Sequence, residues 1–85
     1  MDDGPQIDTD RIDDAVLALM YLTLHSAERL SRQLRAWKSF DWHALKRLHE
    51  RGLIFDPVGK ARSVTLTDEG ARRSEELFHA LFAKR

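Results

Sequence analysis

The sequence predicts a single, mostly helical α+β domain with three helices, a short two-stranded hairpin and a further C-terminal helix. Three observations support this prediction. Asp41 and Gly52 are suited to begin and end a helix between them. Turn-forming residues separate two short apolar runs between positions 53 and 66, as in a hairpin. Thr67 follows directly and can cap the last helix.

Composition limits the kind of protein this is. The 85 residues suffice for one domain, and 42% of hydrophobic residues suffice for a folded core. The absence of cysteine excludes disulfides, thiolate zinc sites and a cysteine nucleophile. The longest apolar stretch, residues 15–22, is too short to cross a bilayer, and the N-terminus lacks the features of a signal peptide. We therefore expect a cytoplasmic protein without a membrane segment.

Charge is balanced overall but unevenly placed. Residues 1–14 contain six aspartates and one arginine, whereas residues 28–51 contain seven lysines or arginines and three acids. A net charge of zero argues against a highly basic coat protein, but it leaves room for a modest basic face. Ordinary solvated helix faces would give the same pattern. We predict that residues 1–8 form a flexible acidic tail and that residues 9–85 form the domain.

The first helix is predicted to have Thr9 or Asp10 as its N-cap and to continue to about Leu24. Asp13 and Asp14 would lie in its first turn, where the helix dipole favours anions. Apolar residues occupy most of its circumference, so it must be covered on most sides. In a chain of this size such a helix is either the centre of the domain or part of a homodimer interface, and the sequence favours neither.

The second helix is predicted over residues 27–38, with Ser26 as its cap. Leu30, Leu34 and Trp37 follow the i, i+4, i+7 spacing of a buried helical stripe. This pattern predicts that Trp37 lies in the core.

The third helix has the most specific local signals, and we predict it over residues 42–51. Asp41 is a strong N-cap, and Phe40 before it can meet Leu45 as a hydrophobic staple. Gly52 suits the left-handed backbone position that ends a helix. Both ends of this helix are therefore marked in the sequence.

The hairpin and the final helix complete the domain. Residues 62–66 alternate, with Val64 and Leu66 on one face, as in a half-buried strand that pairs with residues 53–55. In the last helix, apolar residues cover an arc of roughly 140°, wider than the ~100° that a core-facing stripe needs. Part of this arc, in particular Phe82, is available to a partner chain.

The second half of the chain contains two motifs, Leu45-x-x-Leu48-x-x-x-Gly52-Leu53-Ile54 and Leu66-Thr67-Asp68-Glu69-Gly70. Together they resemble the second half of many bacterial winged helix-turn-helix regulators. In those domains a glycine closes the recognition helix, a hairpin forms a wing, and the second motif starts the following helix. The resemblance implies a winged helix-turn-helix fold.

Shorter runs carry a narrower likeness, namely Ala15-Val16-Leu17-Ala18-Leu19, Leu22-Thr23-Leu24-His25, Arg35-Ala36-Trp37-Lys38, Asp41-Trp42 and Gly59-Lys60-Ala61. They are similar to a family of small bacterial proteins of unknown function. This resemblance implies no particular activity.

Charged and hydrogen-bonding side chains point away from the buried side of the third helix and lie on the wing. The candidate DNA contacts are His43, Lys46, Arg47 and Glu50 on the helix and Lys60 and Arg62 on the wing. In a winged-helix protein the helix residues would face the major groove and the wing residues the phosphate backbone. Mixed charges on an exposed helix are also ordinary solvent-facing chemistry.

We expect a small DNA-binding transcriptional regulator that forms a homodimer through its first and last helices. The alternative is a winged-helix module that binds another protein and not DNA, with Trp42 and Phe82 as candidate partner contacts. We expect no enzyme, cofactor, metal site or small-molecule substrate. The four histidines lack the spacing of a helical metal site, and the sequence has no glycine-rich phosphate loop and no nucleophile elbow.

Overall fold

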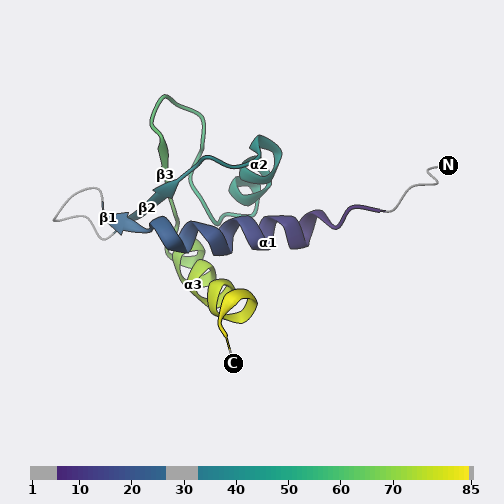
Figure 1. Cartoon of the computed structure of the whole chain (residues 1–85). Helices are drawn as coiled ribbons and strands as arrows, with labels where there is room; N and C mark the ends of the chain where they lie inside the picture. The colour runs from purple at the N-terminus through teal and green to yellow at the C-terminus, as the bar shows by residue number, and fades with distance from the viewer. Residues whose placement is uncertain (1–5, 27–32, 85) are drawn as a thin grey trace.

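The computed structural model describes residues 6–26 and 33–84, which form three helices and a three-stranded antiparallel sheet (Figure 1). The elements in chain order are α1 (Thr9–Met20), a 3₁₀ turn η1 (Tyr21–Thr23), β1 (His25–Ser26), β2 (Leu34–Trp37), α2 (Trp42–Glu50), β3 (Ser63–Thr65) and α3 (Asp68–Phe82). The predicted α+β class is confirmed. Residues 1–5, most of the predicted tail, and residues 27–32, half of the predicted second helix, lie outside the described residues.

Helix α1 lies across the middle of the molecule and packs against both other helices (Figure 1). Its N-cap is Asp8 and not the predicted Thr9 or Asp10, because the Asp8 carboxylate accepts a hydrogen bond from the Arg11 amide at 3.1 Å. The helix ends at Met20, short of the predicted end, because the chain tightens into η1. Leu17 and Met20 are fully buried. Helix α1 is therefore the central helix, one of the two roles expected for it.

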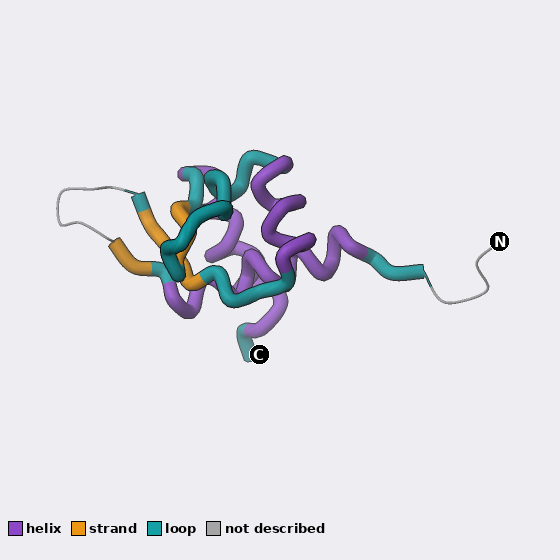
Figure 2. The backbone as a smooth tube through the Cα atoms, turned by 90° about the horizontal axis from the view of Figure 1, so that it is seen from above, coloured by secondary structure: helices purple, strands orange, loops and turns teal. Residues whose placement is uncertain are grey.

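The sheet has the strand order β1–β2–β3 and lies at one end of the molecule (Figure 2). Ala36 of β2 pairs with Val64 of β3, and both side chains belong to the core. Next to β3, an isolated bridge between Ile54 and Leu66 adds one further antiparallel pair. The predicted hairpin therefore forms only in part, since residues 53–55 contribute a bridge rather than a full strand.

Residues 34–37 form strand β2, so the predicted second helix is wrong where the structure describes it. Leu34 and Trp37 would share one helical face, but alternation along a strand sends them to opposite faces. Ala36 is buried and Trp37 is 48% exposed, so the expected core position of Trp37 is also wrong. Pairing with β1 and β3 satisfies the backbone groups on both edges of β2. Within the described residues, a strand and not a helix precedes α2.

Helix α2 begins and ends as its local signals predict, to within one residue. An Asp41 carboxylate oxygen accepts a hydrogen bond from the Ala44 amide at 3.2 Å. At the other end Gly52 adopts a φ of 75°, and the Leu53 amide donates to the Leu48 carbonyl at 3.0 Å. This bond satisfies a carbonyl that the end of the helix would leave without a partner.

Helix α3 starts at its predicted cap and is tied to α1. The Thr67 hydroxyl accepts a hydrogen bond from the Gly70 amide at 3.0 Å. One turn later the buried Ser74 hydroxyl donates to the Leu17 carbonyl of α1 at 2.6 Å. A buried hydroxyl needs such a partner, so this bond fixes where the two helices cross.

Candidate nucleic-acid interface

Helix α2 turns its apolar side, with Leu45 and Leu48, into the core. His43, Lys46 and Glu50 lie on the opposite side and are exposed, as predicted. The structure records no hydrogen bond or ion pair between any of these three side chains and another described residue. The outer side of α2 therefore offers an ammonium, an imidazole and a carboxylate to a ligand.

Arg47 is held by α1 rather than presented to solvent. Its Nε and Nη2 donate to the two carboxylate oxygens of Asp13 at 2.7 and 2.8 Å. Asp13 is 1% exposed, and the Arg47 side chain is 32% exposed. The prediction that Arg47 lies on the free side of the helix is wrong, because its guanidinium neutralises a carboxylate that would otherwise be buried alone.

This ion pair favours the charged state of the guanidinium. The hydrogen bond to Asp13 raises the pKa of Arg47 above its usual value, and the negative charges of nearby aspartates add to the effect. A second arginine, Arg51, lies 3.6 Å from Asp14 of α1. Both arginines of this segment are thus directed to acids of α1, and Lys46 is the cation that α2 presents to solvent.

The loop formed by residues 55–62 projects from the molecule between α2 and β3 (Figure 1). The Lys38 ammonium donates to the carbonyls of Pro57 and Gly59 at 2.6 and 3.1 Å. Gly59 has a φ of 143°, which side chains disfavour. The two Lys38 hydrogen bonds connect the loop to the residue that follows β2. Because both acceptors are neutral carbonyls, they do not cancel the charge of Lys38.

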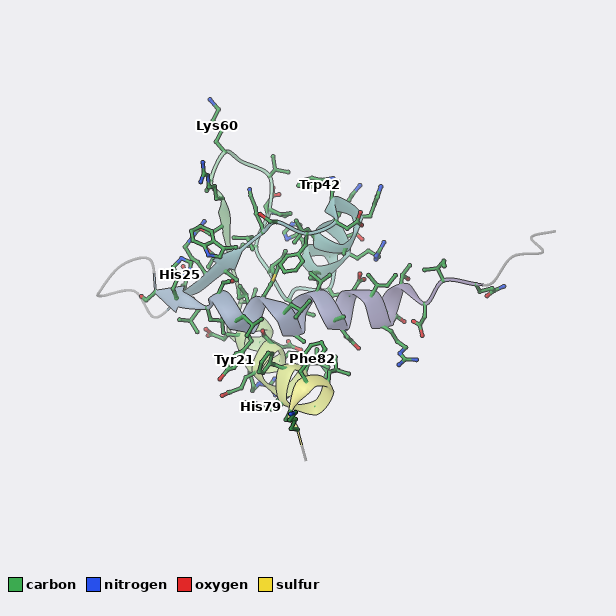
Figure 3. The ribbon with its side chains drawn as sticks, in the orientation of Figure 1. Tyr21, His25, Trp42, Lys60, His79 and Phe82 are labelled. Atoms are coloured by element: carbon green, nitrogen blue, oxygen red, sulfur yellow. The ribbon has the colours of Figure 1, made fainter. Side chains whose placement is uncertain are left out.

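Lys60 and Arg62 lie on this loop, and both side chains are exposed. Within the described residues neither forms an ion pair. Lys60 at the tip of the loop and Trp42 at the start of α2 lie on the same side of α1 (Figure 3). Trp42 is 47% exposed. We call the surface formed by six exposed residues of the loop and of α2 the loop–helix surface; its members are Trp42, His43, Lys46, Glu50, Lys60 and Arg62.

Phe82, the other candidate partner contact, lies on the opposite side of α1 (Figure 3). It is 47% exposed, and its ring centroid is 5.9 Å from that of Phe78. Phe78 in turn lies 5.0 Å from Tyr21. The Tyr21 hydroxyl donates a hydrogen bond to the Glu75 carboxylate at 3.3 Å. The negative charge of Glu75 raises the pKa of Tyr21 above its usual value. This side is therefore aromatic and partly uncovered.

The sequence-based prediction does not include the roles that three side chains have in the structure. Asp13 fixes Arg47, Lys38 braces the loop, and Arg35 is bonded to side chains of β3. Asp13 could have been noticed because it precedes Val16 and Leu17 by three and four residues, which places an acid on the same helical face as these apolar residues. Residues 34–37 also fit the alternating pattern of a strand. In a strand, Arg35 would lie beside residues of a neighbouring strand.

The described residues contain no group of three or more His, Cys, Asp or Glu side chains that could hold a metal ion. No helix in the described part of the chain is long and apolar enough to cross a membrane.

Comparison with known proteins assigns the chain to a family. A family model described as a domain of unknown function (DUF6429) matches residues 8–84. The chain is 63% identical over 79 residues to the uncharacterised protein y4hR of Sinorhizobium fredii, a match that covers 93% of this chain and 99% of that protein. No solved structure matches the chain. The resemblance to small bacterial proteins of unknown function is confirmed, and the chain belongs to the DUF6429 family.

Proposed function

We propose that this protein binds duplex DNA through the loop–helix surface and that it does so as a homodimer. The observation that carries the proposal is the set of cations on this surface, Lys46, Lys60 and Arg62, which are exposed and unpaired among the described residues. Phosphate neutralisation by such cations supplies most of the affinity of a protein for DNA irrespective of sequence.

The distribution of charge along the chain supports this surface. Residues 33–66 contain seven lysines or arginines and three acids, whereas residues 6–26 contain four aspartates and one arginine. The first set includes α2 and the projecting loop, and the second includes α1. Arg47 and Arg51 of the first set are paired with Asp13 and Asp14 of the second, so five cations and three acids remain in the first set and two acids and one arginine in the second. A polyanion would therefore be attracted to the side with α2 and the loop and repelled from the start of α1.

The order of the elements also supports the proposal. A helix closed by a glycine, a loop between Ile54 and β3, and a further helix capped by Thr67 follow one another as in the second half of a winged-helix domain. In that arrangement α2 would enter the major groove and loop 55–62 would be the wing. Because Arg47 is bound to Asp13, the loop would contribute more of the phosphate contacts than α2.

A homodimer would use the other side of the molecule. Ile12 and Leu19 of α1 are 41% and 37% exposed, and Leu81 and Phe82 of α3 are 49% and 47% exposed. Exposed apolar side chains concentrated on two neighbouring helices are typical of a protein interface. Dimerisation there leaves the loop–helix surface free, and a two-fold axis would present two α2 helices about one DNA turn, ~34 Å, apart.

One observation favours the alternative, a protein-binding module. The loop–helix side also exposes apolar residues, among them Trp42 at 47% and Val58 at 69%. Exposed aromatic residues are enriched at protein interfaces. A protein partner would depend on Trp42 and would be insensitive to removal of the Lys60 charge.

The proposal is tested with a labelled duplex of mixed sequence, titrated with the protein while fluorescence anisotropy is recorded. The variant Lys60→Ala/Arg62→Ala removes two of the three cations and should weaken binding of every duplex at low salt, since phosphate contacts carry no sequence information. Lys84→Ala, which removes an exposed cation beyond α3, serves as the matched control and should bind as the wild type does. Equal affinity of the wild type and the double variant would refute the assignment of the surface.

A further inference from the structure

The outer face of the sheet is a second surface with recognisable chemistry, distinct from the loop–helix surface. The strand register defines it. His25 is paired with Arg35, Arg35 with Thr65, and Trp37 with Ser63, so these five residues lie on one face. The opposite face carries Ala36 and Val64 and is buried in the core. Figure 3 shows His25 at the sheet end of the molecule, well separated from Trp42.

One further residue extends this face. Ile54 forms the bridge with Leu66 on the core side, and the Phe55 amide donates to the Thr65 carbonyl at 2.9 Å. Alternation then turns the Phe55 ring to the outer face, and it is 46% exposed. The row His25, Arg35, Thr65, Phe55 crosses the sheet over roughly 14 Å, given a spacing of about 4.8 Å between neighbouring strands.

Arg35 lies in the middle of this row and is fixed in place. Its Nε and Nη1 donate to the hydroxyls of Ser63 and Thr65 at 2.7 and 2.6 Å, and its Nη2 donates to the Ser63 carbonyl at 2.7 Å. All three acceptors are neutral, so the positive charge is held rigidly without being cancelled. The three strands contain no aspartate or glutamate. The face is therefore positive at its centre.

Aromatic rings flank this charge. Trp37 is 48% exposed, and its ring centroid lies 5.4 Å from that of His25. The His25 Nδ1 lies 2.7 Å from the Thr23 carbonyl, which holds the imidazole in place. On the other side of Arg35 lies the exposed ring of Phe55. Half-exposed rings near a fixed guanidinium form a surface on which flat, negatively charged ligands can stack.

We propose that the outer sheet face binds single-stranded nucleic acid, with unpaired bases stacked on Trp37 and Phe55 and the phosphate backbone neutralised by Arg35. Stacking on exposed aromatic rings over a sheet, combined with a cationic track, is how proteins hold unpaired nucleotides. The bases of a duplex are stacked on each other and do not present their faces to such a surface. Because the strands contain no acids, the positive charge of Arg35 on this face attracts a polyanion. The same charge repels a basic protein segment.

The experiment uses a single tryptophan as reporter. The chain has two tryptophans, so Trp42→Phe leaves Trp37 as the reporter on this face. This variant is titrated, at about 50 mM salt, with an oligonucleotide of about 12 thymidines, a length within the range that a small binding fold covers. An abasic strand of the same length, which keeps the phosphates but lacks the bases, is the matched ligand control. Base stacking should quench Trp37 fluorescence with the thymidine strand and leave it nearly unchanged with the abasic strand.

Variants then identify the face. Trp37→Leu should weaken binding of the thymidine strand roughly 5- to 150-fold, the value of one stacked base, whereas Trp37→Phe keeps a ring and should retain most of the affinity. Lys84→Ala, which changes an exposed residue beyond α3, should bind as the wild type does. Equal binding of the abasic strand, or unchanged affinity of a folded Trp37→Leu protein, would overturn the proposal. If the variant Lys60→Ala/Arg62→Ala loses duplex binding but still binds the thymidine strand, this site is separate from the loop–helix surface.

Discussion

Asp13 is a buried carboxylate on α1, and Arg47 reaches it from a position 34 residues further along the chain. An unpaired buried carboxylate is costly, and a bidentate arginine with short hydrogen bonds compensates for much of that cost. The pair therefore joins α1 to α2. It also withdraws one cation from the loop–helix surface.

Replacement of Arg47 should destabilise the fold. In Arg47→Ala the carboxylate of Asp13 remains buried without its partner, and removal of one member of a buried pair is far more harmful than removal of an exposed charge. We expect the midpoint of thermal unfolding, followed by circular dichroism, to fall by about 10 °C or more. Lys46→Ala, one residue away and exposed, is the matched control and should unfold near the wild-type temperature. Equal midpoints for the two variants would show that the ion pair does not support the fold.

Helices and strands differ in how far the sequence predicts them. The limits of α2 follow from neighbouring residues, the Asp41 cap and the Gly52 terminator, so both are predicted correctly. Strand β2 depends on β3, whose Ser63 pairs with Trp37 from far along the chain. A local pattern that fits both a helical stripe and an alternating strand cannot decide between them without that partner.

The start of α3 is governed by a close approach to the chain that follows α2. A Cβ atom added to Gly70 would lie 1.7 Å from the Leu53 carbonyl oxygen. That carbonyl accepts hydrogen bonds from both the amide and the hydroxyl of Thr67, each at 3.1 Å. The glycine of the Leu66–Gly70 motif is therefore required by packing of the helix start against Leu53.

Substitution of this glycine should be among the most harmful changes in α3. In Gly70→Ala the methyl group meets backbone atoms, which cannot rotate away, so the two segments must separate. We expect the free energy of unfolding, measured by urea denaturation, to fall by about 2 kcal/mol or more. Glu69→Ala changes an exposed residue in the same turn and should have little effect. A Gly70→Ala protein as stable as Glu69→Ala would mean that α3 starts further from Leu53 than described.

The two sides of α1 differ in chemistry. The loop–helix surface carries unpaired cations, and the side with Phe82 exposes apolar groups of α3. The candidate contacts on α2 could be predicted from a helical projection because exposure is a local property. The ion pair of Arg47 with Asp13 could not be predicted in this way, because it depends on how α1 and α2 pack together.

The apolar side should mediate self-association. In the double variant Leu19→Ser/Phe82→Ser, two exposed apolar side chains become polar, which should weaken a dimer while sparing the core. Sedimentation velocity should show a dimer for the wild type and a monomer for this variant. Val58→Ser changes an exposed apolar residue on the projecting loop and should leave the dimer intact. A wild-type protein that remains monomeric at high micromolar concentration would exclude the proposed interface.

The salt dependence of duplex binding is the sharpest test of whether cations of the loop–helix surface neutralise DNA phosphates. With Lys46, Lys60 and Arg62 as the phosphate contacts, the logarithm of affinity should fall with the logarithm of salt concentration with a slope of about −3 per bound protomer. Affinity should then drop roughly 40-fold for each protomer between about 50 and 200 mM salt. Duplex binding by this surface requires such a slope for the wild type and a slope near −1 for Lys60→Ala/Arg62→Ala, which keeps one of the three cations. Absence of binding at the lower salt concentration, or binding that salt does not affect, would contradict it.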